Sequence, residues 1–369
     1  MKKVTILKFT IIYGVFLACL TGFVLLDSFV MPHRYSAVSA AETDDEAENV
    51  TDDKADAEAG DKAEAHTDDE KEEKAGHRPD FKNFMGEGHM PKERPEKGRS
   101  WSGDKAEGSA DSGAEKKQES SEIQIEDAES IGEYHSDGID IYLSKKRVND
   151  TDVYVADVKL KNASSLRTAL AENTYGRNIT EETSEMAEEN GAILAINGDY
   201  YGSRQSGYVI REGVLYRNVA KEGNEDLVIF KDGSFRIIQE EDITAEELID
   251  MGAEQVLSFG PALIENGKTA VDDSDEVGMA MRSNPRTAIG VVDELHYVFV
   301  VADGRTSDNA GLTLKELADF MDTLGVQTAY NLDGGGSSAM VFQGELVNNP
   351  TTSGRNTQER SVSDIVYIR

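Results

Sequence analysis

One stretch, Tyr330-Asn331-Leu332-Asp333-Gly334-Gly335-Gly336-Ser337-Ser338-Ala339-Met340, decides what we predict for both the fold and the site. Apolar residues lead into it from Gln327 and follow it through Phe342, which indicates two strands joined by a polar, glycine-rich corner. Three consecutive glycines allow positive φ angles and close approach to a ligand. Their amides and the two serine hydroxyls would suit an anion such as phosphate. The alternative is a plain hairpin turn, since Asp-Gly is a common hairpin signal, although such a turn needs fewer glycines.

Three aspartates come just after apolar runs. Asp333 ends the run described above, Asp199 follows residues 192–196, and Asp303 follows residues 298–302. Loops at strand ends display functional groups on a rigid scaffold, so we interpret all three as candidate catalytic carboxylates. Each could equally be a turn residue, because an Asp side chain readily accepts hydrogen bonds from nearby backbone amides.

Arginines beside these motifs are candidates for binding an anion. Arg286 begins an apolar run, Arg305 stands in Asp303-Gly304-Arg305, and Arg282 is a further candidate. A guanidinium binds phosphate through two parallel hydrogen bonds. Tyr200 is a candidate for stacking on a sugar, with core packing as the alternative. The predicted substrate-binding residues are Arg286, Arg305, Asn197, Gly198, Asn331, Gly334, Gly335, Gly336, Ser337, Ser338 and Tyr200.

Four segments together resemble the phosphodiester glycosidase family. They are Ala195-Ile196-Asn197-Gly198-Asp199-Tyr200-Tyr201, Asn284-Pro285-Arg286-Thr287-Ala288-Ile289-Gly290, Val301-Ala302-Asp303-Gly304-Arg305 and Asn331-Leu332-Asp333-Gly334-Gly335-Gly336-Ser337-Ser338. The resemblance covers roughly residues 139–369 and implies a hydrolase that breaks the glycosidic C–O bond of a sugar 1-phosphodiester. Many members have a neutral residue and phenylalanines where this chain has Asp199-Tyr200-Tyr201, which leaves the sugar undefined.

Such a reaction needs little help with its leaving group, because a phosphate monoester departs readily. It does need cations for the departing phosphate and a carboxylate that acts as base, nucleophile or stabiliser of the sugar cation. Two other functions stay open on the residues alone. One is a non-catalytic glycan-binding or exopolysaccharide assembly protein, and the other is a phosphodiesterase that cleaves the P–O bond. In each case the expected partner is a sugar phosphate or a surface glycan.

No cofactor is required by these motifs. Clustered aspartates would suit Ca²⁺ or Mg²⁺, but no Asp-x-Asp-x-Asp calcium loop occurs, so a metal stays open. Cys19 is the only cysteine, which excludes an intramolecular disulfide and a thiolate metal site. The formal net charge of −33 disfavours nucleic acid as a partner.

The sequence predicts an α+β domain over residues 139–369, with mixed, largely antiparallel sheets and a few helices. Helices are expected at residues 180–190, 244–251 and 313–324. The last two begin with the capping-box pairs Thr244/Glu247 and Thr313/Glu316. A hairpin is expected over residues 287–301, and a closing strand over 363–368.

The first 41 residues predict a membrane anchor. Lysines precede an uncharged apolar run from Phe9 to Leu26, which is 18 residues long. The flanking charge predicts a single-pass protein of the cell membrane, with its domain on the extracytoplasmic side. A signal peptide cleaved near Val38-Ser39-Ala40 is the alternative.

Residues 42–138 predict an acidic, disordered linker. Between Glu42 and Glu133 there are 30 acidic and 13 basic residues and few branched or aromatic ones. Such a segment buries too little apolar surface to offset the entropy lost on ordering. We therefore expect a tether between membrane and domain.

Overall fold

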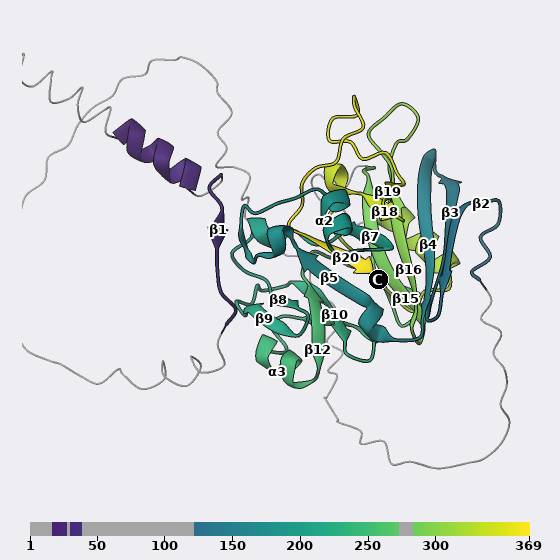
Figure 1. Cartoon of the computed structure of the whole chain (residues 1–369), viewed down its shortest axis with the longest axis horizontal. Coiled ribbons are helices and arrows are strands. Elements are labelled where there is room, and N and C mark those ends of the chain that lie inside the picture. Colours follow the sequence, from purple (N-terminus) through teal and green to yellow (C-terminus); the bar gives the residue numbers. More distant parts are fainter. Residues whose placement is uncertain (1–16, 28–29, 39–121, 273–282) are drawn as a thin grey trace, which may run out of the picture. The chain divides into compact units, whose positions relative to one another are not determined.

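The structure is a computed structural model that describes residues 17–27, 30–38, 122–272 and 283–369 (Figure 1). The large sheet has eight strands. In spatial order they are β14 (Lys268–Thr269), β13 (Ala262–Glu265), β17 (Thr328–Asn331), β15 (Arg286–Asp293), β16 (His296–Ala302), β4 (Thr151–Leu160), β3 (Ile139–Val148) and β2 (Glu129–Ser136).

Two smaller sheets have five strands each. The β7 sheet runs β19 (Glu345–Leu346), β18 (Met340–Phe342), β7 (Leu194–Asn197), β20 (Asp364–Ile368) and β5 (Leu166–Leu170). The β10 sheet runs β11 (Phe235–Gln239), β10 (Glu225–Phe230), β12 (Ala253–Leu257), β8 (Val209–Arg211) and β9 (Val214–Arg217). A short pair joins β1 (His33–Arg34) to β6 (Gly176–Arg177).

The predicted α+β class with largely antiparallel sheets and few helices is confirmed, but the sheets are not mixed. Within the described ranges, all named strand pairs are antiparallel. The expected hairpin over residues 287–301 is β15 and β16, and the closing strand is β20.

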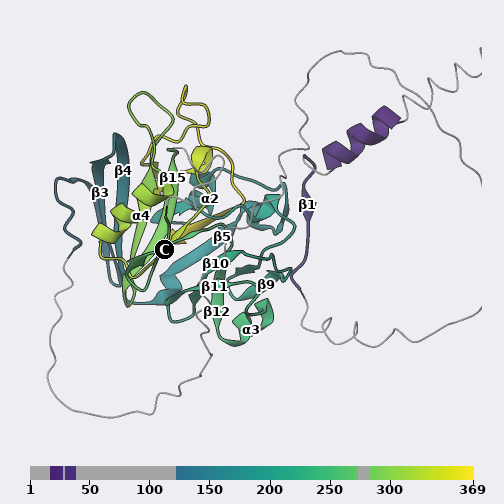
Figure 2. The same ribbon diagram turned by 180° about the vertical axis from the view of Figure 1, so that it is seen from behind.

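Strand β16 shows how the layers are built. Its residues are apolar without interruption from Tyr297 to Ala302, as expected of a strand covered on both faces. Tyr297, Phe299 and Val301 pack into a core shared with Ile196 and Val366 of the β7 sheet. Val298, Val300 and Ala302 pack on the other side with Leu317 and Met321 of α4 (Leu314–Thr323), which covers this face in Figure 2. The large sheet therefore lies between the β7 sheet and α4.

The helices begin and end close to their predicted positions. α3 (Ala245–Asp250) and α4 both have complete capping boxes, from Thr244 with Glu247 and Thr313 with Glu316. α2 (Thr183–Glu189) is shorter than the predicted 180–190. It packs on the outer side of the β7 sheet, where Met186 and Ala187 join Ala195 and Ile365 in a separate apolar cluster.

The glycine-rich stretch is not a hairpin. β17, before it, belongs to the large sheet, and β18, after it, belongs to the β7 sheet. Residues 332–339 therefore cross from one sheet to the other at the point where both strands end. A periodic pattern predicts a strand but not the strand with which it pairs. The sequence alone therefore could not exclude a hairpin at this position.

The predicted linker overlaps the large sheet. β2 pairs with β3 in this sheet, and Ile123 and Ile125 pack against the core beneath α4. The ordered domain thus begins before the predicted boundary at residue 139. β2 has exposed and half-exposed residues only, so no apolar alternation marked it as a strand. Residues 42–121 lie outside the described ranges.

Part of the predicted anchor is described. Residues 17–27 form a helix with mostly exposed side chains. Among the described helices, none has the length and apolar character needed to cross a membrane. Residues 1–16, which include the first half of the apolar run, lie outside the described ranges.

Candidate active site

The turn between the two sheets is held tightly by its neighbours. Its 3₁₀ helix η6 (Gly335–Ser337) begins with Gly335 at φ 65°, whose N–H donates to the Pro285 carbonyl over 2.8 Å. A Cβ on Gly335 would lie 2.7 Å from Nη2 of Arg305, and one on Gly336 would lie 2.4 Å from Oγ1 of Thr352. Glycine is required here because the backbone must fit beneath the Arg305 guanidinium.

Asp333 lies at the start of this turn, at the end of β17. Its residue is 8% exposed, and its N–H donates to the Gly198 carbonyl over 3.1 Å. Burial raises the pKa of its carboxyl group, while Ser337, Arg360 and the Gly334 amide oppose that rise. The result is a carboxylate that is largely desolvated yet in contact with a cation.

The cation is Arg360, which the sequence analysis did not single out. Its Nη2 lies 3.3 Å from Oδ2 of Asp333, and its Nε donates to Oγ of Ser337 over 2.9 Å. The Arg360 side chain is 42% exposed, so part of its guanidinium faces solvent. It comes from the loop before β20, where no glycine or aspartate motif marks it. The only sequence signal was its position shortly before the closing strand.

Arg305 completes the cluster of charges. Its Nη1 donates to the Thr352 carbonyl over 3.0 Å, and its Nε and Nη2 approach Oδ1 of Asn284 at 3.3 and 3.2 Å. Burial lowers its pKa, Arg360 lowers it further, and Asp333 raises it. The two arginines and Asp333 thus act on one another electrostatically.

Arg286 is the first residue of β15, which pairs with β17. It is 6% exposed, and its Nε donates to the Leu312 carbonyl over 2.9 Å. That bond ties the start of β15 to the segment before α4. Arg282, the third predicted arginine, lies outside the described ranges.

Asn197 and Gly198 hold the two sheets together at the site. The Asn197 side chain donates to the Asp333 carbonyl over 2.6 Å and accepts from Thr287 of β15 at 2.8 Å and from the Ala339 amide at 3.2 Å. A Cβ on Gly198 would lie 2.4 Å from Oδ1 of Asp364. The Asn197 side chain thus supports the backbone at Asp333, and its predicted substrate-binding role stays a prediction.

Asp199 belongs to a buried ion cluster. Its Oδ2 lies 2.9 Å from Nη2 of Arg211, which also contacts Asp364 at 2.6 Å. Amides of Tyr201 and Ser258 donate to it as well. Burial alone would raise the pKa of Asp199, but Arg211 and these amides outweigh it and lower the pKa. These contacts join Asp199 to Arg211 and to backbone amides, not to Asp333.

Both carboxylate oxygens of Asp303 accept hydrogen bonds from the protein. The residue is 2% exposed and accepts hydrogen bonds from the Asn348 side chain, the Asn349 amide and the Asn349 side chain at 2.9–3.1 Å. These bonds fix the loop after β19. Of the three predicted catalytic aspartates, Asp333 alone contacts the partly exposed Arg360.

Some of the remaining predicted substrate-binding groups make hydrogen bonds within the protein, and others do not. The amides of Gly335, Ser337 and Ser338 donate to backbone carbonyls, which leaves fewer for an anion than the sequence suggested. Two buried oxygens, Oγ of Ser338 and Oδ1 of Asn331, have no hydrogen-bond partner in the described part of the chain. The predicted sugar-binding Tyr200 is 44% exposed, consistent with contact to a ligand rather than core packing.

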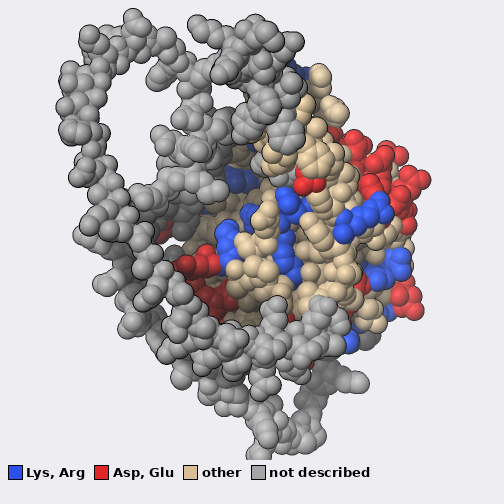
Figure 3. All heavy atoms as spheres, turned by 90° about the vertical axis from the view of Figure 1, so that its left-hand side faces the viewer, with Lys and Arg blue, Asp and Glu red and all other residues tan. Residues whose placement is uncertain are grey.

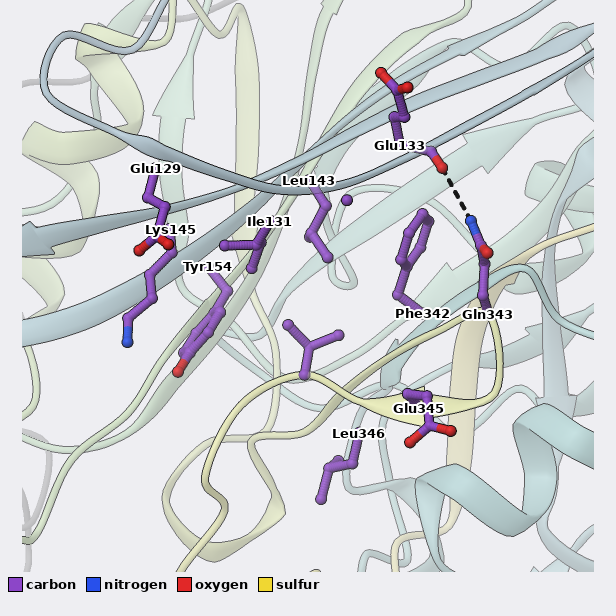
Figure 4. A pocket seen from close by; sticks show the side chains of 12 residues that line it. Glu129, Ile131, Glu133, Leu143, Lys145, Tyr154, Phe342, Gln343, Glu345 and Leu346 are labelled. Atoms are coloured by element: carbon purple, nitrogen blue, oxygen red, sulfur yellow. Dashed lines mark hydrogen bonds between the residues drawn. The ribbon is translucent and has the colours of Figure 1, made fainter.

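A cavity of about 680 Å³ lies elsewhere, between β2–β4 and β18–β19 (Figure 4). Leu143, Phe342 and Leu346 line it together with acidic residues. Its wall includes Tyr154, whose hydroxyl lies 3.5 Å from Oδ2 of Asp303. Asp333 does not line this cavity, so size alone does not locate the site.

The sequence left a metal site open. The described residues contain no cluster of three His, Cys, Asp or Glu side chains suited to hold a metal ion.

The fold and site define a class, an antiparallel α+β domain with a carboxylate and two arginines where its sheets meet. Residues 190–369 match the family model described as phosphodiester glycosidase. The match confirms the resemblance to that family seen in the sequence.

The chain is also similar to curated proteins. The chain is 28% identical over 240 residues to the SPbeta prophage-derived uncharacterized protein YomE of Bacillus subtilis, covering 63% of this chain and 36% of that protein. It is 29% identical over 198 residues to mouse N-acetylglucosamine-1-phosphodiester alpha-N-acetylglucosaminidase, covering 48% of this chain and 38% of the enzyme. The chain thus spans little more than a third of these relatives.

One solved structure supports the fold. The catalytic domain of the zebrafish N-acetylglucosamine-1-phosphodiester alpha-N-acetylglucosaminidase superposes with a TM-score of 0.52 at 23% identity. The match covers 66% of this chain and 87% of that domain.

Proposed function

We propose that the domain is a hydrolase that cleaves the glycosidic C–O bond of sugar 1-phosphodiesters. The observation that carries the proposal is the contact between buried Asp333 and partly exposed Arg360 beside Arg305. The match to the phosphodiester glycosidase model and the named activity of the mouse relative support it.

The charges suit the two halves of such a reaction. As the C1–O bond breaks, its electron pair leaves with the phosphate monoester, where Arg360 and Arg305 offer guanidinium donors. Positive character develops on the sugar ring, where the Asp333 carboxylate can stabilise it or accept a proton from the attacking water. The water oxygen ends on C1 of the sugar.

Isotope labelling tests the proposal directly. The full chain is incubated with a sugar 1-phosphodiester in ¹⁸O water, and the products are followed by phosphorus NMR and mass spectrometry. We expect the label in the free sugar. Label in phosphate would establish P–O cleavage instead, and binding without turnover would establish a non-catalytic glycan-binding protein.

The proposed setting is the outer face of a membrane, with a surface polysaccharide or other glycan as substrate. The uncharged run from Phe9 to Leu26 and the lysines before it support this placement. Protease added to intact cells should remove the domain, and alkaline carbonate should leave the chain in the membrane pellet. A protected domain, or a chain released by carbonate, would overturn the placement.

A further inference from the structure

A second cavity, of about 370 Å³, has an unusual lining for so acidic a protein. Three arginines and three tyrosines line it: Arg177, Arg204, Arg217, Tyr35, Tyr175 and Tyr216. No Asp or Glu is among its lining residues. They lie in β6 and β9, just after β1, just before β6 and just after η4 (Tyr201–Ser203). Figure 3 views the molecule from the side on which β1 and β9 lie in Figure 1, and Lys and Arg side chains gather in the middle of that face.

Arg217 is the deepest of these cations. It is 8% exposed and donates to the carbonyls of Gly207, Tyr201 and Arg204. Its buried Nη2 has no hydrogen-bond acceptor among the described residues. These carbonyl bonds give Arg217 a structural role on their own, but they do not neutralise its charge or use all its donors.

Two of the lining arginines, Arg204 and Arg217, have no carboxylate within ion-pair distance among the described residues. Burial lowers the pKa of Arg217, an effect that Tyr175 and Asp199 oppose and that Arg211 and Arg204 reinforce. A bound anion would offset the free-energy cost of burying the Arg217 charge.

Aromatic faces stand beside the cations. Tyr175 stacks on Tyr201 with ring centroids 5.5 Å apart and packs on Tyr216 at 4.9 Å, so it is a buried support. Tyr35 is 48% exposed and packs on Tyr175 at 6.0 Å. Tyr35 and half-buried Tyr216 thus offer ring surface at the mouth of the cavity.

One loop links the cavity to the candidate active site. At its start Gly198 accepts the Asp333 N–H, and six residues later Arg204 lines the cavity. The exposed Tyr200 lies between them in the chain.

We propose that this cavity is a second saccharide-binding subsite, selective for a sugar unit that carries an anionic group. The anion contacts Arg217 and Arg204, and the sugar ring stacks on Tyr35 and Tyr216. The ligand class is a phosphorylated or uronic saccharide. Binding at this subsite requires no bond cleavage, so it is measured independently of the proposed hydrolysis.

The test is isothermal titration of the full chain with glucose 6-phosphate and with glucuronate, which separate a phosphate ligand from a carboxylate ligand. Glucose and inorganic phosphate are the component controls. We expect at least one acidic sugar to bind about tenfold more tightly than either component, as one added charge-assisted contact or ring contact would give. Equal binding of glucose, or no binding of either acidic sugar, would overturn the proposal.

Variants locate the binding. Arg204→Gln and Tyr35→Ala should each weaken the acidic sugar about tenfold. Arg34→Gln is the matched control, since Arg34 neighbours Tyr35 but pairs with Glu172 and does not line the cavity. Tyr35→Phe should bind as the parent does, and Asp333→Asn should retain binding. Equal loss in Arg34→Gln, or loss in Asp333→Asn with none in Tyr35→Ala, would place the ligand elsewhere and refute the subsite.

Discussion

Two carboxylate–arginine clusters of the domain differ in what surrounds them. In the first, Arg211 and Asp199 have side chains that are 2% and 0% exposed, and Arg211 also binds Asp364 and two backbone carbonyls. In the second, Arg360 is 42% exposed and only one of its nitrogens approaches Asp333. The first arginine is saturated by protein groups, whereas the second keeps room for a ligand. The same residue types therefore bind one another within the protein in one place and, under the proposed function, bind the substrate in the other.

The largest effect on activity is expected for Asp333→Asn. The change keeps the size of the side chain but removes its charge and basicity, so turnover should fall about 10²–10⁴-fold. The free energy of unfolding should change by less than about 1 kcal/mol. Steady-state kinetics and urea unfolding measure both. Asp319→Asn, on the surface of α4, is the matched control. Parent-like turnover in a folded Asp333→Asn protein would remove Asp333 from the site.

The largest effect on stability is expected for Asp199→Ala. It leaves Arg211 buried with one carboxylate and exposes two amides to an apolar space, which should cost about 3–5 kcal/mol of unfolding free energy. Asp199→Asn should cost less, because it can still accept from Ser258 or Tyr201. A stable Asp199→Ala protein without activity would show that the two clusters share the chemistry.

A smaller loss of activity is expected for Arg360→Gln. Losing one charge-assisted contact to the substrate phosphate should lower kcat/KM about 10–100-fold. Arg355→Gln, in the same loop and exposed, is the control. If both variants lose activity equally, the effect is long-range charge and not contact with phosphate.

The buried Asp364 should also make the free energy of unfolding depend on pH. Burial, and next the charge of Asp199, raise the pKa of Asp364 to about 8, so the folded protein holds a proton that the unfolded chain releases above about pH 4. Stability from this group is therefore fully present below pH 4 and is lost as pH rises toward 8, by at most about 1.4 kcal/mol per pH unit.

Urea unfolding between pH 5 and pH 8 measures this slope. In Asp364→Asn the contribution should disappear, so the difference in stability between variant and parent should change across that range. A difference that stays constant with pH would show that Asp364 is ionised in the folded protein.

The smallest effect concerns the domain boundary. A chain that begins at residue 122 keeps β2 and the packing of Ile123 and Ile125, while one that begins at residue 139 loses them. The shorter chain should be less stable by about 1–2 kcal/mol, because these side chains are only partly buried. Equal melting temperatures of the two chains would support the boundary at residue 139 that the sequence predicted.

Local signals in the sequence predicted most elements of the fold. Capping pairs located α3 and α4, and uninterrupted apolar runs located β7 and β16, because these depend on neighbours in the chain. The pairing of β17 and β18 with different sheets depends on distant partners, and no local pattern encodes it. The polar β2 gave no apolar alternation at all.

The residues of the candidate site divide in the same way, into those marked by local sequence and those brought together by distant contacts. Asp333 could be found because a strand end and a glycine turn adjoin it in sequence. Asp199 and Asp303 share that sequence pattern, and only three-dimensional contacts distinguish their use, through Arg211 and through Asn348 and Asn349. Arg360 was missed because it reaches the turn across 27 residues of chain from Asp333.

The crossing of residues 332–339 between two sheets has a kinetic consequence. Asn197 of the β7 sheet contacts both Thr287 of the large sheet and the backbone at Asp333, so the site is assembled only when the two sheets dock. A folding intermediate with either sheet formed alone would be inactive. During refolding, catalytic activity would then return at the rate at which the two sheets dock. It would return later than spectroscopic signals of strand formation.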